Sequence, residues 1–282
     1  MDSFPILEVS HVTKTYPKTG IVALDDVTLA VRRGEIHGVV GELGAGKTTL
    51  MKILGGLIPA GSYQGEILFE GAPLAARSTG DAIRRGIGVV PRPLSIFPKL
   101  TVAENIVMGG WQAERHFFVS KTSTERAAEV VMSRWGLNFG GATNAAELSA
   151  GQQRLLMVAR VLAAEPKLIV MDELTHGIKS PQGLSQLLLM VRRLAEHEVT
   201  CLYLARRPSD AFQLADRVTV LRDGTVVGQW ERANFDEAAV TQAMASQRDG
   251  EPTEYDDLNE TGSGGIMGSL NNFFDRLLRP GS

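Results

Sequence analysis

The stretch EIHGVVGELGAGKTTLMKILGGL, residues 35–57, decides the fold expected for this chain. It joins an apolar run, a glycine-rich turn and a helical pattern, and the turn matches the spacing G-x-x-x-x-G-K-[ST] from Gly41 to Thr48. Glycines in the turn allow successive N–H groups to point inward, and the following helix adds its N-terminal dipole. The stretch therefore predicts a cradle for phosphate groups.

The side chains of this cradle have separate expected roles. Lys47 is expected to reach the terminal phosphates of a nucleotide, and the Thr48 hydroxyl to occupy one position on a bridging Mg²⁺. The remaining residues are expected to line the nucleotide, and they are Gly41, Glu42, Leu43, Gly44, Ala45, Gly46 and Thr49.

A second motif is the apolar run LIVMDE, residues 168–173, which ends in Asp172 and Glu173. Buried strands rarely finish in two carboxylates without a partner for them. We expect Asp172 to join Thr48 around Mg²⁺, and Glu173 to orient an attacking water or accept its proton. Taken alone, the pair could also be two solvated acids at a strand end.

Composition excludes several classes of protein. The chain has 282 residues, 44% hydrophobic and 22% charged, which is typical of soluble proteins. A net charge of -3 without a basic run gives no reason to expect nucleic acid as a partner. No segment approaches the length of a membrane span, and the N-terminus lacks a secretory signal, so a cytoplasmic location is expected. The single cysteine, Cys201, is expected in a buried strand.

Short β-branched runs alternate with helical patterns along the chain, which predicts an α/β fold with a mostly parallel sheet between helices. Residues 94–162 are rich in helix formers and are expected to form an inserted helical subdomain, with residues 1–93 and 163–247 forming the two parts of the core. Residues 248–265 have a linker composition. Residues 266–279 predict an amphipathic helix that docks on a partner or a membrane, or packs on its own domain.

A third motif, LSAGQQRLLMVARVL from residue 148, resembles the signature sequence of ABC ATPases. The resemblance extends over residues 7–245 and is strongest to the xylose- and ribose-type monosaccharide importers. It implies a P-loop NTPase fold, with a RecA-like sheet and an N-terminal antiparallel β part, and ATP sandwiched between two subunits. The signature residues, implied to act on the ATP of the second subunit, are Leu148, Ser149, Ala150, Gly151 and Gln152. An ordinary capped helix is the alternative.

The resemblance also implies a role for Tyr16 and draws attention to several departures. Tyr16 lies where the family keeps an aromatic residue that stacks on adenine, although packing is an equal alternative.

Arg92 replaces the family's loop glutamine, and Arg206 replaces its switch histidine. Arginine attracts phosphate but cannot accept a hydrogen bond, so we expect ATP binding to persist while hydrolysis slows. The alternative is that both arginines are solvated and that this branch of the family tolerates them without loss of hydrolysis. Further departures are Leu43 for Asn, Leu174 for Pro and Lys179 for Asp.

The resemblance implies an ATP-binding subunit of a sugar importer, peripheral on the cytoplasmic face of the cell membrane. Its expected partners are membrane-spanning permease subunits, a second and different ATP-binding chain, and indirectly an external solute-binding protein. Importers of this branch usually carry two ATPase halves in one chain, whereas this chain carries one. The alternatives are a homodimeric motor, a soluble regulatory ABC protein, and a chromosome-maintenance ATPase, which the lack of heptads and of basic surfaces disfavours.

Overall fold

The computed structural model describes residues 4–92, 96–111 and 120–245. The linker predicted at 248–265 and the amphipathic helix predicted at 266–279 lie outside the described residues. Within the described part of the chain, no helix is long and apolar enough to cross a membrane.

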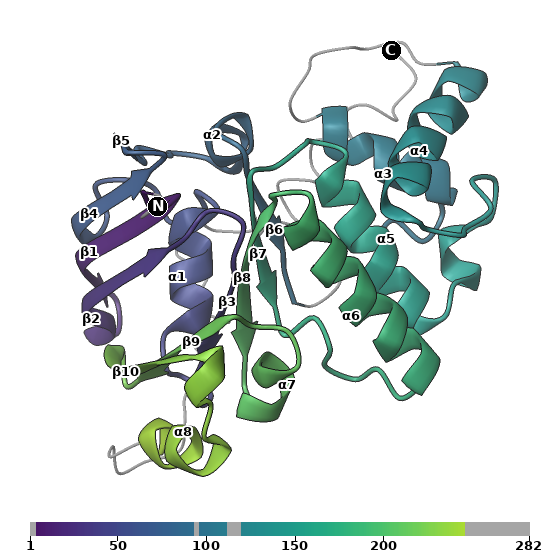
Figure 1. Cartoon of the computed structure of the whole chain (residues 1–282). Helices are drawn as coiled ribbons and strands as arrows, with labels where there is room; N and C mark the ends of the chain where they lie inside the picture. Colours follow the sequence, from purple (N-terminus) through teal and green to yellow (C-terminus); the bar gives the residue numbers. More distant parts are fainter. Residues whose placement is uncertain (1–3, 93–95, 112–119, 246–282) are drawn as a thin grey trace.

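The larger of two sheets has six strands in the order β10-β9-β3-β8-β7-β6 (Figure 1). The parallel strands are β3 (Ile36–Val40), β6 (Ile87–Val90), β7 (Leu168–Asp172), β8 (Thr200–Ala205) and β9 (Arg217–Arg222), and β10 (Thr225–Glu231) pairs with β9 antiparallel. Every residue of β3, β7 and β8 is buried, since both faces of the sheet are covered. The predicted mostly parallel sheet is confirmed.

The smaller sheet is antiparallel, with the order β2-β1-β4-β5. Its strands are β1 (Leu7–Tyr16), β2 (Ile21–Val31), β4 (Gln64–Phe69) and β5 (Ala72–Pro73). Helix α1 (Lys47–Leu54) lies between the two sheets (Figure 1), and its apolar side chains Leu50 and Ile53 are buried in one core with both. The loop before α1 is therefore held at the carboxyl end of β3.

Helices cover the opposite face of the larger sheet (Figure 1). Between β6 and β7, the described residues form helices and one isolated bridge but no strand, which agrees with the helical composition of that stretch. Whether residues 94–162 form a separate subdomain stays a prediction. The helices after α1 are α2 (Thr79–Arg84), α3 (Val102–Trp111), α4 (Lys121–Trp135), η1 (Ala145–Glu147), α5 (Ala150–Leu162), α6 (Pro181–Glu196), α7 (Pro208–Phe212), η2 (Arg232–Asn234) and α8 (Glu237–Met244). Of these, α2 packs in the core that also holds α1.

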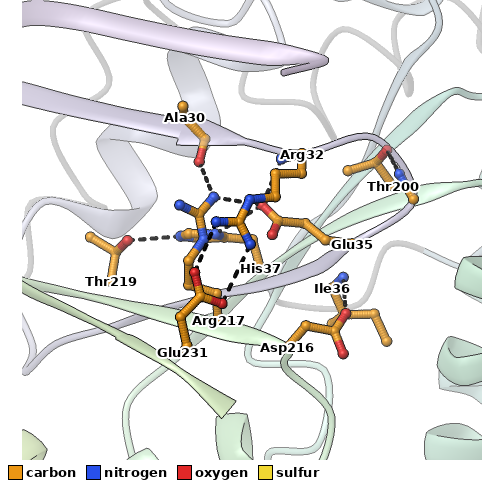
Figure 2. A network of polar contacts seen from close by, with 11 residues as sticks. Ala30, Arg32, Glu35, Ile36, His37, Thr200, Asp216, Arg217, Thr219 and Glu231 are labelled. Atoms are coloured by element: carbon orange, nitrogen blue, oxygen red, sulfur yellow. Dashed lines mark hydrogen bonds and ion pairs between the residues drawn. The ribbon is translucent and has the colours of Figure 1, made fainter. Parts of the chain in front are cut away.

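A polar network joins the two sheets at the amino end of β3 (Figure 2). The buried His37 ring has Nδ1 3.2 Å from Glu35 Oε1 and Nε2 2.8 Å from Thr219 Oγ1. Arg217 donates to Glu35 Oε1 at 2.8 Å and to the Ala30 carbonyl at 2.6 Å. Because Ala30 belongs to β2 and Arg217 to β9, the network fixes β3 at the end opposite the glycine-rich loop.

Candidate functional site

The loop of residues 41–46 packs tightly against backbone from both sheets. Gly46 has a φ of +104°, and a Cβ at this position would lie 2.4 Å from the Ala23 carbonyl oxygen. A Cβ on Gly41 would lie 2.3 Å from the Leu221 carbonyl oxygen. Only glycine fits these two positions, so β2 and β9 determine the shape of the cradle.

Lys47 is folded back onto its own loop. Its side chain is buried, and Nζ donates to the carbonyl oxygens of Gly41 at 2.7 Å and Glu42 at 2.9 Å. Burial lowers the pKa of Lys47 to about 8, and the nearby carboxylates of Asp172 and Glu173 partly oppose this shift. A buried ammonium group of this kind gains from an arriving anion, but it must leave the loop carbonyls to reach one.

A cavity of about 40 Å³ lies between the loop and the carboxyl end of β7. Residues 43–49 line it together with Lys52, Arg92, Asp172 and Glu173. The predicted magnesium ligands Thr48 and Asp172 thus face one cavity, and they offer a hydroxyl and a carboxylate oxygen, the donors that Mg²⁺ prefers. These residues fit the proposed ion.

Basic side chains surround the carboxylate of Glu173, whose side chain is 8% exposed. Arg92 Nη1 donates to Oε2 at 2.7 Å, so this oxygen accepts a charge-assisted hydrogen bond largely out of water. Arg206 Nε lies 3.8 Å from Oε1, and His176 Nδ1 lies 3.8 Å from Oε2. The two arginines that the sequence singled out are therefore both drawn to Glu173.

A second cavity, of about 650 Å³, also borders this carboxylate. Leu43 and Glu173 line both cavities, so Glu173 borders each of them. The larger cavity is lined by Glu42, Leu43, Glu173, Thr175, His176, Gly177, Tyr203, Ala205, Arg206, Arg207 and Asp210.

The signature residues begin α5, which packs on the face of the larger sheet opposite α1. Ser149 caps the helix, and Gln152 completes a capping box by accepting from the Ser149 N–H at 3.0 Å. Ser149 and Ala150 are exposed, whereas Leu148 and Gly151 are buried. The capped helix that was the alternative interpretation is present, and the contact with a second subunit's ATP stays a prediction.

In the structure, Tyr16 has the packing arrangement that was the alternative interpretation. Its side chain is 4% exposed and belongs to the core between the sheets, with its hydroxyl 3.2 Å from Thr49 Oγ1. Lys14 Nζ lies 5.1 Å from the centre of the ring. Tyr16 is thus a packing residue in this conformation, and its stacking on adenine stays a prediction.

The position of His176 was not anticipated from the sequence. The signal that could have found it is local, because residues three apart in a tight turn face each other, and the His176 N–H donates to the Glu173 carbonyl at 2.9 Å. The ion pair between Arg92 and Glu173 joins residues 81 positions apart and has no comparable local signal.

The glycine-rich loop between β3 and α1, facing an Asp-Glu pair at the end of a neighbouring parallel strand, defines the class of P-loop nucleotide-binding proteins. Residues 24–176 match the sequence model of the ABC transporter family. The chain belongs to that family.

Two curated relatives are ATP-binding proteins of sugar import systems. A xylose import ATP-binding protein of Moorella thermoacetica is 37% identical over 81% of this chain and 44% of its own length. A ribose import ATP-binding protein of Rubrobacter xylanophilus is 38% identical over 80% of this chain and 44% of its own length. The chain therefore spans less than half the length of these relatives.

Solved structures share the fold. The ADP conformation of an ATP-binding cassette of an ABC transporter matches with a TM-score of 0.72 and 22% identity, covering 85% of this chain and 99% of that one. A dimeric bacterial ABC transporter cassette matches with a TM-score of 0.69 and 26% identity, covering 81% of this chain and 100% of that one. The P-loop NTPase fold expected from the sequence is confirmed.

Proposed function

We propose that this chain is the ATP-binding subunit of an ABC-type importer for a sugar or related small solute, and that its own site binds ATP but hydrolyses it slowly. The import ATP-binding proteins among its relatives support the class of solute. In this proposal the chain works at the cytoplasmic face of the membrane with permease subunits and, indirectly, an external solute-binding protein.

The residues of the loop cavity have distinct roles in this function. The loop amides and Lys47 bind the phosphates, and Thr48 and Asp172 hold Mg²⁺, which when bound neutralises charge on the phosphates. Glu173 faces the attacking water. The shared lining of the cavity by Lys47, Thr48, Asp172 and Glu173 supports this division.

The observation that carries slow hydrolysis is the 2.7 Å ion pair between Arg92 and Glu173. A carboxylate oxygen already engaged by a guanidinium is poorly placed to accept a proton from water, and the pair is largely out of solvent. General base catalysis typically contributes about 10²- to 10⁴-fold to a rate, so its impairment lowers turnover strongly. Nucleotide binding relies on other groups and is retained.

A slow site with an intact signature favours a different ATP-binding chain as partner. The exposed Ser149 at the start of α5 supports this arrangement, because helix N-termini bind phosphate groups well. The partner would hydrolyse its ATP against this signature, while the site described here keeps its own ATP bound.

Purified full-length chain tests the nucleotide site. Binding of a fluorescent ATP analogue and steady-state phosphate release are measured for the wild type, Lys47→Ala and Glu173→Gln. We expect tight binding that Lys47→Ala abolishes, and wild-type turnover within about tenfold of Glu173→Gln, since the base contributes little. Robust turnover that Glu173→Gln abolishes would overturn slow hydrolysis and favour a conventional homodimeric motor.

Co-purification from cells tests the assembly. The tagged full chain should bring down permease subunits together with a second, different ATP-binding chain. Recovery of permease with this chain as the sole ATP-binding component contradicts the heterodimer. Recovery without any membrane protein favours a soluble regulatory role.

A further inference from the structure

The loop that follows β7 places the His176 side chain beside Glu173. Glu173 has a φ of +45°, and the chain then turns so that the His176 N–H donates to the Glu173 carbonyl at 2.9 Å. The turn brings His176 Nδ1 to 3.8 Å from Glu173 Oε2. That separation is longer than a hydrogen bond, but contacts of catalytic groups commonly tighten only when substrate is bound.

This loop is held from two other elements, which fixes where His176 can lie. Arg154 of α5 donates through Nη2 to the His176 carbonyl oxygen. The Thr175 hydroxyl lies 2.8 Å from the Tyr203 hydroxyl of β8. The backbone of His176 is therefore held by α5 and, through Thr175, by β8 of the larger sheet.

The neighbours of Glu173 differ in what they can do with a proton. The guanidinium groups of Arg92 and Arg206 have N–H donors and no acceptor, so they attract the carboxylate but cannot take a proton from it. Of these three basic neighbours in the described part of the chain, His176 is the one whose ring can present a nitrogen that accepts a proton from Glu173 while the other nitrogen donates one.

The surroundings of His176 give such a proton a route to solvent. Its side chain is 56% exposed, whereas that of Glu173 is 8% exposed. Both line the cavity of about 650 Å³, which shares Glu173 with the cavity at the phosphate loop. A proton received at Glu173 can thus reach water through the His176 ring without crossing the nucleotide site.

We propose that His176 is a proton relay and positioning residue for ATP hydrolysis at this site, an inference that rests on the proposed function. The oxygen of water attacks the γ-phosphorus, and the bond from that phosphorus to the bridging oxygen breaks, with its electron pair leaving on ADP. The proton released by the water passes to Glu173 and then to Nδ1 of His176, which returns it to solvent. His176 thereby sustains the residual turnover that Arg92 limits.

Single-turnover hydrolysis with full-length protein in excess over labelled ATP tests this role. Wild type, His176→Ala and His176→Asn are compared, and nucleotide affinity is measured on the same samples. His176→Ala should lower the rate toward that of Glu173→Gln, a loss of at most about tenfold, because the relay acts only through Glu173, while ATP affinity stays within about threefold. His176→Asn, which keeps hydrogen bonding but cannot take up a proton, should remain slow.

Added imidazole provides the decisive control, because the half-exposed position leaves room for it beside the larger cavity. Imidazole should restore hydrolysis in His176→Ala but not in Glu173→Gln. His11→Ala is the matched variant, since His11 is another exposed histidine beside a carboxylate, 2.7 Å from Asp26, and its rate should equal that of the wild type.

An unchanged rate in His176→Ala overturns the relay, as does a wild-type rate no higher than that of Glu173→Gln. A lowered rate that imidazole fails to restore assigns His176 a structural role and also overturns it. Failure of the proposed function looks different. ATP binding that survives Lys47→Ala would show that the loop cavity is not the nucleotide site. Fast wild-type turnover would overturn the proposal of slow hydrolysis, and the ratio of the His176→Ala rate to the wild-type rate would still test the relay.

Discussion

At the scale of single residues, the charged side chains Lys47, Arg92 and Glu173 form hydrogen bonds and ion pairs with other groups of the site itself. Lys47 donates to the loop carbonyls, and Arg92 pairs with Glu173. ATP must therefore compete with these contacts, and Lys47 has to exchange two carbonyl partners for phosphate oxygens. Because the buried lysine has a lowered pKa, phosphate contacts that favour its charged form offset part of that loss.

Replacing Gly46 with alanine tests whether the tight packing of the loop is needed for nucleotide binding. The new Cβ meets the Ala23 carbonyl oxygen at 2.4 Å and takes a φ of +104°, so the loop must shift. We expect loss of ATP-analogue binding in a chain that still shows a cooperative unfolding transition.

Gly61→Ala is the matched control, because Gly61 has a φ of +92° but nothing within 4 Å of the added Cβ. It should cost only the backbone strain of about 1–2 kcal/mol in the free energy of unfolding and leave ATP binding unchanged. Equal binding by the two variants would show that the packing of Gly46 has no role in the site.

The sequence predicted part of this site because some of its residues are identified by short sequence motifs. Lys47 and Thr48 are fixed by the spacing of the loop, and Asp172 and Glu173 by their place at a strand end. Long-range partners carry no such signal, which is why the pairing of Arg92 with Glu173 emerged only from the structure. Tyr16 shows the converse, since an aromatic residue at a family position can be a core residue in the fold.

At the scale of elements, α5 begins with a residue that has two uses. Ser149 caps the helix within its own chain, and the proposed assembly needs the same exposed hydroxyl for a partner's ATP. The two uses can be separated by substitution, because aspartate also caps a helix but repels phosphate.

Ser149→Ala should lower the free energy of unfolding by about 1 kcal/mol, as loss of a cap usually does, whereas Ser149→Asp should keep the stability of the wild type. Both should weaken ATP-dependent association with the partner ATP-binding chain, Ser149→Asp the more strongly. Urea unfolding measures the first quantity and light scattering with ATP the second. Association by Ser149→Asp as strong as that of the wild type would exclude the proposed phosphate contact.

Strands β3 and β9 share a network that predicts sensitivity to acid. Burial lowers the pKa of His37 below its usual 6.5, so the unfolded chain takes up this proton first as pH falls. For Glu35, burial raises the pKa, but hydrogen bonds from His37 and Arg217 outweigh it and the pKa lies below 4.5. Protonation of both groups therefore lowers the free energy of unfolding as pH falls, below about pH 6.5 for His37 and below about pH 4.5 for Glu35.

We expect the free energy of unfolding to decrease between pH 7 and pH 5, with His37 contributing a slope of at most about 1.4 kcal/mol per pH unit. His37→Gln should reduce this slope, although it also lowers stability at pH 7. His11→Gln, at an exposed histidine, serves as the control and should keep the slope. An undiminished slope in His37→Gln would show that the histidine is not held neutral.

At the scale of the whole molecule, the types of secondary structure follow from patterns of apolar and helix-forming residues in the sequence. Continuous apolar runs became the buried parallel strands, and the stretch without such runs became helical. The order β10-β9-β3-β8-β7-β6 was not available from the sequence, because it depends on which strands pack beside one another. Neither was the polar network between the sheets, whose members are far apart in the chain (Figure 2).

A slow site also predicts how the assembled molecule behaves. Complexes of the wild-type chain with its partner ATP-binding chain, formed with ATP, should persist about as long as those made with Glu173→Gln, because the site of this chain consumes little ATP in either. Size-exclusion chromatography after removal of free ATP measures this lifetime. Rapid dissociation of the wild type alone would indicate turnover at the site.

The most direct test of the central claim is the single-turnover rate of Arg92→Gln combined with Arg206→His, compared with the wild type at matched ATP occupancy. Removing both guanidinium groups frees the Glu173 carboxylate, so hydrolysis should accelerate about tenfold or more while ATP affinity changes only a few-fold. A rate equal to or below that of the wild type, with ATP still bound, would contradict the account.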